Sequence, residues 1–213
     1  AIATFCLFGA LKINPHSKLL DDLRPGNPLL EDMRLAEERM GSVLPLEIVI
    51  EIIEDGQFED IQEVSIISFL DEVSNYISKI SEVGKVTSVS DYFKEINQAM
   101  NDGNPDYYRI PESRDLISQY MLLYESEFES FVNIDYTKLR IAAQIKDIDS
   151  RRSAEIEQEI NNYISSRIPD GLKAEVTGTA LLALKTNNYL VNNLLASFFI
   201  ALLIITFLMI FLF

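Results

Sequence analysis

Few side chains in this 213-residue chain could do nucleophilic chemistry. The single histidine, His16, follows a proline, and the single cysteine, Cys6, lies in an apolar stretch near the start. A Ser-His-Asp or Cys-His arrangement needs a histidine beside its nucleophile in a folded pocket. We therefore expect His16 to be a solvated loop residue. We also expect no disulfide within the chain, since Cys6 has no second cysteine to pair with.

Adjacent carboxylates could do general acid–base work. Such pairs occur at Asp21-Asp22, Glu37-Glu38 and Glu54-Asp55, but 33 acidic residues make adjacent pairs expected by chance. We predict that these pairs are solvated surface. The sequence has no HExxH, CxxC or EF-hand pattern and no phosphate-binding glycine motif. The prediction is therefore a protein that is not an enzyme, with no catalytic residue, no cofactor and no metal site.

Two groups of large side chains could in principle line a pocket for an apolar ligand. Tyr107 and Tyr108 precede Arg109 in a turn-rich loop, where aromatic rings more commonly anchor against the core. A helix is expected from about Glu112 to Glu125, and its apolar stripe is more typical of core than of a binding groove. The residues expected to be buried on that helix are Leu116, Ile117, Tyr120 and either Leu123 or Tyr124. No substrate-binding residue is assigned.

Both ends of the chain lack charged residues. The first 11 and the last 28 residues carry no charged side chain. Residues 194–213 are apolar except for Ser197 and Thr206, which can bond back to their own helix backbone. A helix needs about 20 apolar residues to cross a bilayer. We therefore predict a transmembrane helix over residues 193–213.

The apolar start, residues 1–13, is too short to span a bilayer by itself. It lacks an initiator methionine and a basic leading region, so it fits a signal peptide poorly. We expect it to be the C-terminal part of a transmembrane helix. Because the last apolar run also stops without a flanking charge, we expect the chain to be a piece of a larger membrane protein.

The middle of the chain, residues 14–192, predicts an α+β domain. Period-2 patterns indicate strands near residues 44–54, 85–90, 136–148 and 172–177, and amphipathic helices separate them. Two βαβ units in tandem favour a ferredoxin-like split βαβ sandwich with extra helices, in which right-handed crossovers place the helices on one face of the sheet. The final helix is expected to start near Thr179 and to run through Asn192 and Asn193 into the membrane.

Smaller expectations follow from local patterns. Leu29, Met33, Ala36 and Met40 fall on one helical face, and Gly41 supplies the helix stop. Ser90 or Asp91 is expected to cap a helix after the second strand, and Asp149 or Ser150 a later one. The string Asn-Tyr-Ile-Ser recurs at residues 75–78 and 162–165, near the end of each crossover helix. Duplication and chance both account for this repeat.

The formal net charge of −15 lies entirely on the middle domain. A strongly acidic surface repels nucleic acid and anionic lipid headgroups, so neither is an expected partner. Long loops cross membranes largely regardless of their charge, so the charge does not fix the side on which the domain lies.

Four stretches of the sequence look familiar together. They are Leu23-Arg24-Pro25 through Met40-Gly41 into residues 45–50, residues 108–114 with 117–120 and 122–125, Val176-Thr177-Gly178-Thr179, and the last apolar segment. With these stretches the sequence resembles, over nearly its whole length, the first extracytoplasmic loop of the resistance-nodulation-cell division (RND) superfamily, in the branch of predicted lipid and hydrophobic-compound exporters related to the MMPL proteins. At one position it departs from the family, which usually has an aromatic residue where this chain has Met40.

The resemblance implies the end of transmembrane helix 1, a porter domain of ferredoxin-like type, and transmembrane helix 2. It implies proton-driven export of a lipid or other hydrophobic molecule, with membrane lipids and the remaining domains of the same transporter as partners. The protein would be integral to the cytoplasmic (inner) membrane, with residues 14–192 on the extracytoplasmic or periplasmic side. The family's coupling acids sit in later helices, and neither apolar segment here holds an ionisable residue. The junctions at residues 14–18 and 178–193 are where we expect coupling.

Two other classes stay open. The sensor domain of a bitopic receptor or sensor kinase also lies between two membrane helices. A membrane-tethered enzyme is a third reading, which the missing site chemistry disfavours. The sequence does not name the substrate, the direction of transport, the oligomeric state or the source organism.

Overall fold

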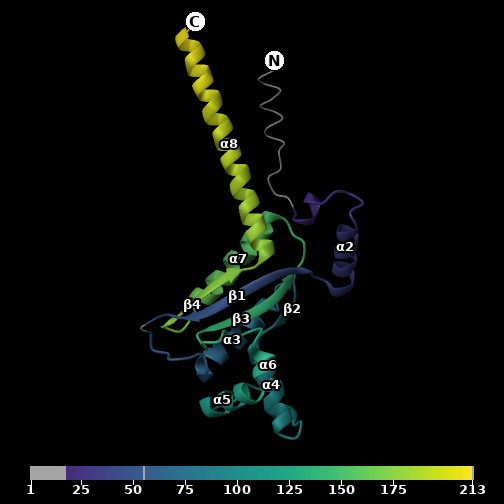
Figure 1. Ribbon diagram of the computed structural model, residues 1–213, viewed down its shortest axis with the longest axis vertical. Coiled ribbons are helices and arrows are strands. Elements are labelled where there is room, and N and C mark those ends of the chain that lie inside the picture. Colours follow the sequence, from purple (N-terminus) through teal and green to yellow (C-terminus); the bar gives the residue numbers. More distant parts are fainter. Residues whose placement is uncertain (1–17, 55, 213) are drawn as a thin grey trace.

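A computed structural model describes residues 18–212 except Asp55, and a four-stranded antiparallel sheet lies at its centre (Figure 1). Along the sheet the strands run in the order β2-β3-β1-β4. The four strands are β1 (Leu44–Ile52), β2 (Val83–Thr87), β3 (Lys138–Ile145) and β4 (Leu172–Thr177). All four were expected, and β4 has the expected bounds.

Two crossover helices connect the strands. Helix α3 (Val64–Ile77) joins β1 to β2, and α7 (Ser150–Ser165) joins β3 to β4. Because β1 and β2 both pair antiparallel with β3, the first two strands are parallel to each other and β3 lies between them. In the same way β1 lies between β3 and β4. The chain is therefore a mixed α+β domain, as the sequence predicts.

One face of the sheet is buried. Along β1 every second side chain is inside, and the intervening ones, such as Glu47 and Val49, face the open side. The inward residues of β1 and β3 meet the apolar faces of α3 and α7 in one core. Each fully buried Leu or Ile contributes about 1.5–3 kcal/mol. The core residues of these four elements are Leu44, Leu46, Ile48, Ile50, Ile66, Ile67, Phe69, Leu70, Val73, Ile77, Leu139, Ile141, Ala143, Ile145, Ile156, Ile160 and Ile164.

The repeated Asn-Tyr-Ile-Ser strings meet in the structure. The rings of Tyr76 and Tyr163 stack with their centroids 3.7 Å apart, and the isoleucine after each tyrosine is buried. Tyr163 Oη donates a hydrogen bond to Glu72 Oε1 at 2.9 Å, and the Arg167 guanidinium lies 4.1 Å from the Tyr163 ring centre. The two tyrosines thus hold matching places in the two βαβ units.

The remaining elements form two groups at opposite ends of the sheet (Figure 1). The 3-10 helix η1 (Leu20–Asp22) and α2 (Pro28–Met40) lie near α8 (Thr179–Leu212). At the far end lie α4 (Val89–Met100), the 3-10 helix η2 (Pro105–Tyr107), α5 (Arg114–Leu123) and α6 (Glu125–Phe128).

Helix α2 ends at Gly41 as expected, with this residue left-handed at φ +83°. Its predicted apolar face is only partly buried. Met33 packs against the core and Ala36 is half-buried, whereas Leu29 and Met40 are 55% and 63% exposed; Leu30, outside that face, is the fully buried residue of the helix. The reason is that α2 stands at the edge of the domain and is covered on one side.

Two further expectations about helices are corrected. The N-cap of α4 is Ser88, not Ser90 or Asp91, because β2 ends at Thr87, earlier than expected; the Ser88 N–H donates to Asp91 Oδ2 at 3.0 Å. On α5 the predicted core residue Leu116 is exposed, and of the alternatives Leu123 and Tyr124 the tyrosine is the one that packs against the core. The α5 residues that do pack inward are Ile117, Tyr120 and Met121, with Tyr124 half-buried. The predicted cap Asp149 is confirmed: its Oδ1 accepts from the N–H groups of Arg151 and Arg152.

An ion pair ties the start of α7 to the turn before β2, and it predicts a pH dependence. Arg152 Nε donates to Glu82 Oε1 at 2.8 Å, and the arginine lowers the pKa of Glu82 from 4.5 to about 2, with help from the Ser81 hydroxyl. A carboxyl with a lowered folded pKa adds stability above its unfolded pKa and loses it as the pH falls through the folded value. Arg152→Met should therefore lower the stability of the domain at pH 7, and the difference from wild type should shrink between pH 4.5 and 2.

Thermal unfolding followed by circular dichroism over this pH range measures the effect. Arg151→Met is the matched control, because its pair with Glu155 is more exposed. A difference between Arg152→Met and wild type that stays constant with pH would contradict the prediction.

Candidate functional site

The candidate site is the end of the sheet where the chain enters and leaves the domain. The pairing register sets Leu44 opposite Ile145 and Glu47 opposite Thr177, so β1 begins where β3 and β4 end. The incoming segment before β1 and the outgoing helix α8 therefore attach to the same end of the sheet. Because β1 is hydrogen-bonded to both β3 and β4, a displacement of the incoming segment also displaces the strand that leads into α8.

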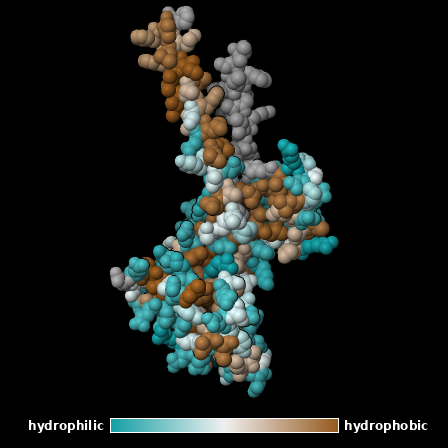
Figure 2. Space-filling view, viewed as in Figure 1, coloured by the Kyte–Doolittle hydropathy of each residue, from teal (hydrophilic) through white to brown (hydrophobic). Residues whose placement is uncertain are grey.

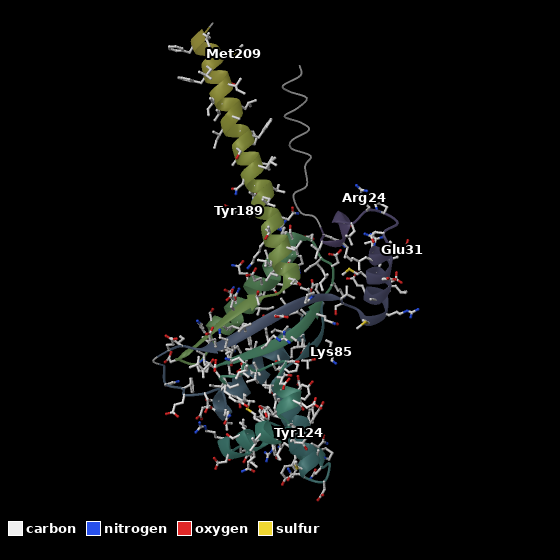
Figure 3. All side chains as sticks on the ribbon, in the orientation of Figure 1. Arg24, Glu31, Lys85, Tyr124, Tyr189 and Met209 are labelled. Carbon is white, nitrogen blue, oxygen red and sulfur yellow. The ribbon has the colours of Figure 1, made fainter. Side chains whose placement is uncertain are left out.

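Helix α8 connects the domain to the apolar end of the chain without a break. Its 34 residues give a length of about 50 Å. Leu181 and Leu184 at its base are buried, whereas the residues from Tyr189 onward are exposed, with Val191 and Leu195 partly so. Figure 3 shows Tyr189 partway along this helix and Met209 near its far end. The expected continuous helix through Asn192 and Asn193 is confirmed.

Within the described part of the chain, one helix is long and apolar enough to cross a membrane, and it is the stretch Leu181–Leu212. Figure 2 shows apolar atoms along its outer part and polar atoms near its base. Thr206 Oγ1 donates to the Leu202 carbonyl at 2.7 Å, as predicted. Its hydroxyl is therefore satisfied inside the helix, which removes the cost of placing it in lipid.

Gly178 is the single residue between β4 and α8, and it packs against β1. A Cβ atom at this position would lie 2.6 Å from the Pro45 carbonyl oxygen and 3.2 Å from Leu46 Cα. Its φ of +130° is also one that L side chains rarely adopt. Only glycine allows the helix to begin this close to the sheet, so the direction of α8 is fixed by contact with β1.

A second contact holds the base of α8 to α7. Lys185 Nζ lies 2.5 Å from Glu157 Oε1, the Lys185 side chain being about half exposed. Ion pairs this exposed contribute less than about 1 kcal/mol. The apolar contacts of Leu181 and Leu184 are therefore the main attachment, and the ion pair sets which side of the helix faces α7.

The incoming segment is attached by Asp147, just after β3. Its carboxylate accepts two backbone hydrogen bonds, from Leu19 N–H at 3.0 Å and from Leu20 N–H at 3.3 Å. The backbone N–H of Asp147 in turn donates to Glu37 Oε1 on α2 at 2.7 Å. One residue at the end of a sheet strand thus holds both η1 and α2 in place.

The electrostatics of Asp147 reflect its burial. Desolvation raises the pKa of its carboxyl, while the Leu20 and Leu19 N–H groups and nearby Lys18 oppose the rise and Glu37 adds to it. A carboxylate that is costly to bury is kept in place by the hydrogen bonds it accepts. The sequence alone does not single out Asp147, because a single Asp after a strand is a common loop residue and Asp147 is not part of an adjacent pair of acids.

Several residues singled out from the sequence lie outside the described part of the chain. They are Cys6, His16, residues 1–13, most of the junction at residues 14–18, and Asp55. Asp21, Glu38 and Glu54 are exposed. Glu37 is half-buried and bonded to Asp147, so it supports the junction. Among the residues that the structure describes, no group of three His, Cys, Asp or Glu side chains could hold a metal ion.

The aromatic pair in the loop before α5 does not anchor in the core, contrary to the more favoured expectation. The rings of Tyr107 and Tyr108 are exposed at the surface. Arg109 lies 5.7 Å from the Tyr107 ring centre and Lys94 lies 5.6 Å from that of Tyr108. Tyr107 and Arg109 border a hollow of about 360 Å³ whose wall includes Tyr120. Arg109 lies against the Tyr107 ring at this hollow, which leaves the hollow poorly suited to a purely apolar ligand.

Comparison with protein-family models and with curated proteins finds no match for this chain.

The close approach at Gly178 gives a stability prediction. Gly178→Ala should lower the free energy of unfolding by about 2 kcal/mol or more, because the new Cβ meets the Pro45 carbonyl oxygen and the backbone is strained. Gly103→Ala is the matched control, since Gly103 has φ +74° but nothing within 4 Å of the added Cβ. Chemical denaturation of both variants in detergent measures the difference. Equal losses of unfolding free energy in the two variants would show that the positive φ alone, and not the contact with β1, causes the destabilisation.

The contacts of Asp147 give a second prediction. Asp147→Ala removes both acceptors of the Leu19 and Leu20 amides, and hydrogen bonds to charged groups contribute about 1.5–3 kcal/mol. We expect hydrogen exchange at these two amides to speed up by about tenfold or more. Exchange in α2 should change little, because the bond from the Asp147 N–H to Glu37 survives the substitution. Asp21→Ala is the control; a similar acceleration there would rule out the role given to Asp147.

Proposed function

We propose that this chain belongs to a proton-driven RND-type exporter of the MMPL-like branch, which moves lipids or other hydrophobic compounds. The observation that carries the proposal is the junction: a helix of membrane-spanning length leaves the sheet through one glycine, at the end where Asp147 holds the incoming segment.

The fold supports the porter-domain part of this proposal. In a ferredoxin-like split βαβ domain, two βαβ units interleave their strands in one antiparallel sheet. The strand order β2-β3-β1-β4 and the crossover helices α3 and α7 fit this description. We therefore propose a ferredoxin-like porter domain, with α2 and the group α4 to α6 as additions at its two ends.

The mechanism we propose is rigid-body rocking. Alternating access requires an element with two arrangements that moves as a unit. The core between the sheet and α3 and α7 makes the domain stiff, and Gly178 with Leu181 and Leu184 seats α8 on it. A tilt of the outer part of α8 would therefore turn the whole sheet, which would open or close a path between this domain and its neighbour in the transporter.

Energy coupling would take place elsewhere in the same protein. Proton transfer inside a bilayer requires ionisable side chains there. From Thr186 to the end of the chain there is no Asp, Glu, Lys, Arg or His. In this proposal α8 carries motion and no protons, the substrate is lipid or another hydrophobic molecule, and the domain lies on the extracytoplasmic side of the cytoplasmic membrane.

The test breaks α8 between the domain and its apolar part. Proline inside a helix removes a backbone hydrogen bond and costs about 3 kcal/mol or more. In the complete protein, Leu184→Pro should reduce export of a fluorescent lipid at least about tenfold, at equal abundance in the membrane. Leu184→Ala is the matched control: it loses the same buried side chain but keeps the helix, and it should retain most of the export.

The outcomes separate the proposal from its rival. Export by Leu184→Pro at the wild-type rate would contradict the rocking mechanism. A complete protein that exports nothing, but changes a cytoplasmic signalling activity when a ligand is added outside, would identify the domain as the sensor of a bitopic receptor. That result would replace the proposed function.

A further inference from the structure

The end of the domain opposite α8 carries an exposed apolar surface. Figure 3 shows Tyr124 at this end and Met209 at the other extreme of the molecule. We call distal surface the region formed by the C-terminal half of α5, α6 and the loop before β3. Leu122, Leu123 and Ile134 are 78%, 65% and 95% exposed there. Figure 2 shows apolar atoms gathered at this end of the molecule.

A hollow of about 390 Å³ lies in the distal surface. This volume is at the lower end of the range for ligand sites and is large enough for one or two bulky side chains. Its lining combines apolar and acidic side chains. The lining residues are Met121, Phe128, Val132, Ile134 and Tyr136, with Glu125, Glu129 and Asn133.

The loop that presents Ile134 is built to hold its shape. Asn133 Oδ1 accepts from Thr137 N–H at 2.9 Å and from Lys138 N–H at 2.7 Å, and Asn133 Nδ2 donates to Thr137 Oγ1 at 2.9 Å. Tyr136 takes a left-handed backbone at φ +53° to complete the turn. An apolar side chain on a braced loop loses little entropy on binding, which is typical of an interface anchor.

The charges around the hollow are of one sign. Glu125 and Glu129 line it, and Glu127 and Asp135 are exposed beside it. No Lys or Arg is part of its lining, and none of these four carboxylates forms an ion pair within the described part of the chain. A positively charged partner is therefore favoured over an uncharged one.

We propose that the distal surface docks a partner protein whose contact surface presents an apolar side chain surrounded by Lys or Arg. The partner's apolar side chain enters the hollow, and Ile134 packs against the partner. A small ligand inside the hollow would leave Leu122, Leu123 and the outer side of Ile134 in water. The surface also lies at the opposite end from the helix that could cross a membrane, which disfavours lipid, and a second copy would bring like charges together.

The test uses the full chain in nanodiscs of zwitterionic lipid and, as probe, a fluorescent amphipathic peptide of leucine and lysine. Binding is followed by fluorescence anisotropy, with empty nanodiscs subtracted. Ile134→Asn should weaken binding at least about tenfold, because a central apolar anchor is lost. Glu125→Gln with Glu129→Gln should weaken it about threefold to tenfold and flatten its salt dependence.

Matched controls separate docking from general attraction to an acidic domain. Glu31→Gln with Glu38→Gln removes two exposed charges from α2, and Met40→Gln removes an exposed apolar side chain there; both should leave binding within about twofold of wild type. Ile134 is almost fully exposed, so Ile134→Asn should keep the wild-type melting temperature.

Three results would overturn the proposal. The first is equal weakening by the distal and the α2 variants. The second is tetraphenylphosphonium binding as tightly as the peptide and unaffected by Ile134→Asn, which would make the hollow a small-molecule site. The third is self-association of the chain in nanodiscs that Ile134→Asn abolishes, which would make a second copy the partner. None of these results depends on whether the protein exports lipid.

Discussion

The contact between Gly178 and the start of β1 constrains the rest of the molecule. The chain turns from a sheet strand into a helix of 34 residues within one residue, and that residue touches the Pro45 carbonyl oxygen and Leu46. A longer connection would let α8 swing freely. Here the helix axis is set by the sheet, and Leu181 and Leu184 then fall against the core. The apolar helix is therefore continuous with a base that packs against the domain.

The two attachments at this end of the sheet differ in chemistry, and the difference bears on how motion would pass. The α8 attachment is apolar and buried, so pulling it away exposes core to water. The incoming segment instead depends on hydrogen bonds to Asp147, a carboxylate whose burial is itself unfavourable. The second attachment is the easier one to open. In a rocking domain we would expect α8 to carry the force and the segment around Leu19 and Leu20 to yield.

The sequence predicts those features that depend on local pattern. The strand β4 and the start of α8 were placed correctly because a turn at residues 169–171 and Gly178 punctuate the chain on both sides. Features that depend on tertiary contact were missed. Periodicity shows that α2 and α5 have apolar residues at helical spacing, but not that Leu29, Leu116 and Leu123 lie at the surface of the described domain. Asp147 was missed for the same reason, since its partners lie over 120 residues away. Of the exposed α5 leucines, Leu122 and Leu123 belong to the distal surface, whereas Leu116 lies in the N-terminal half of the helix, outside it.

The distribution of ion pairs separates two surfaces that the net charge alone would treat alike. On the open face of the sheet two acids are paired: Glu51 contacts Lys138 at 3.0 Å and Lys173 at 3.2 Å, and Glu47 contacts Arg140 at 3.4 Å. That face is close to neutral by itself and has little electrostatic need of a partner. Among the described residues, the carboxylates around Ile134 form no ion pair, and they surround apolar side chains that water solvates poorly. An acidic domain could neutralise its distal end as it does its sheet. Because it leaves both charge and apolar area open at one place, that place is where a partner would gain most by binding.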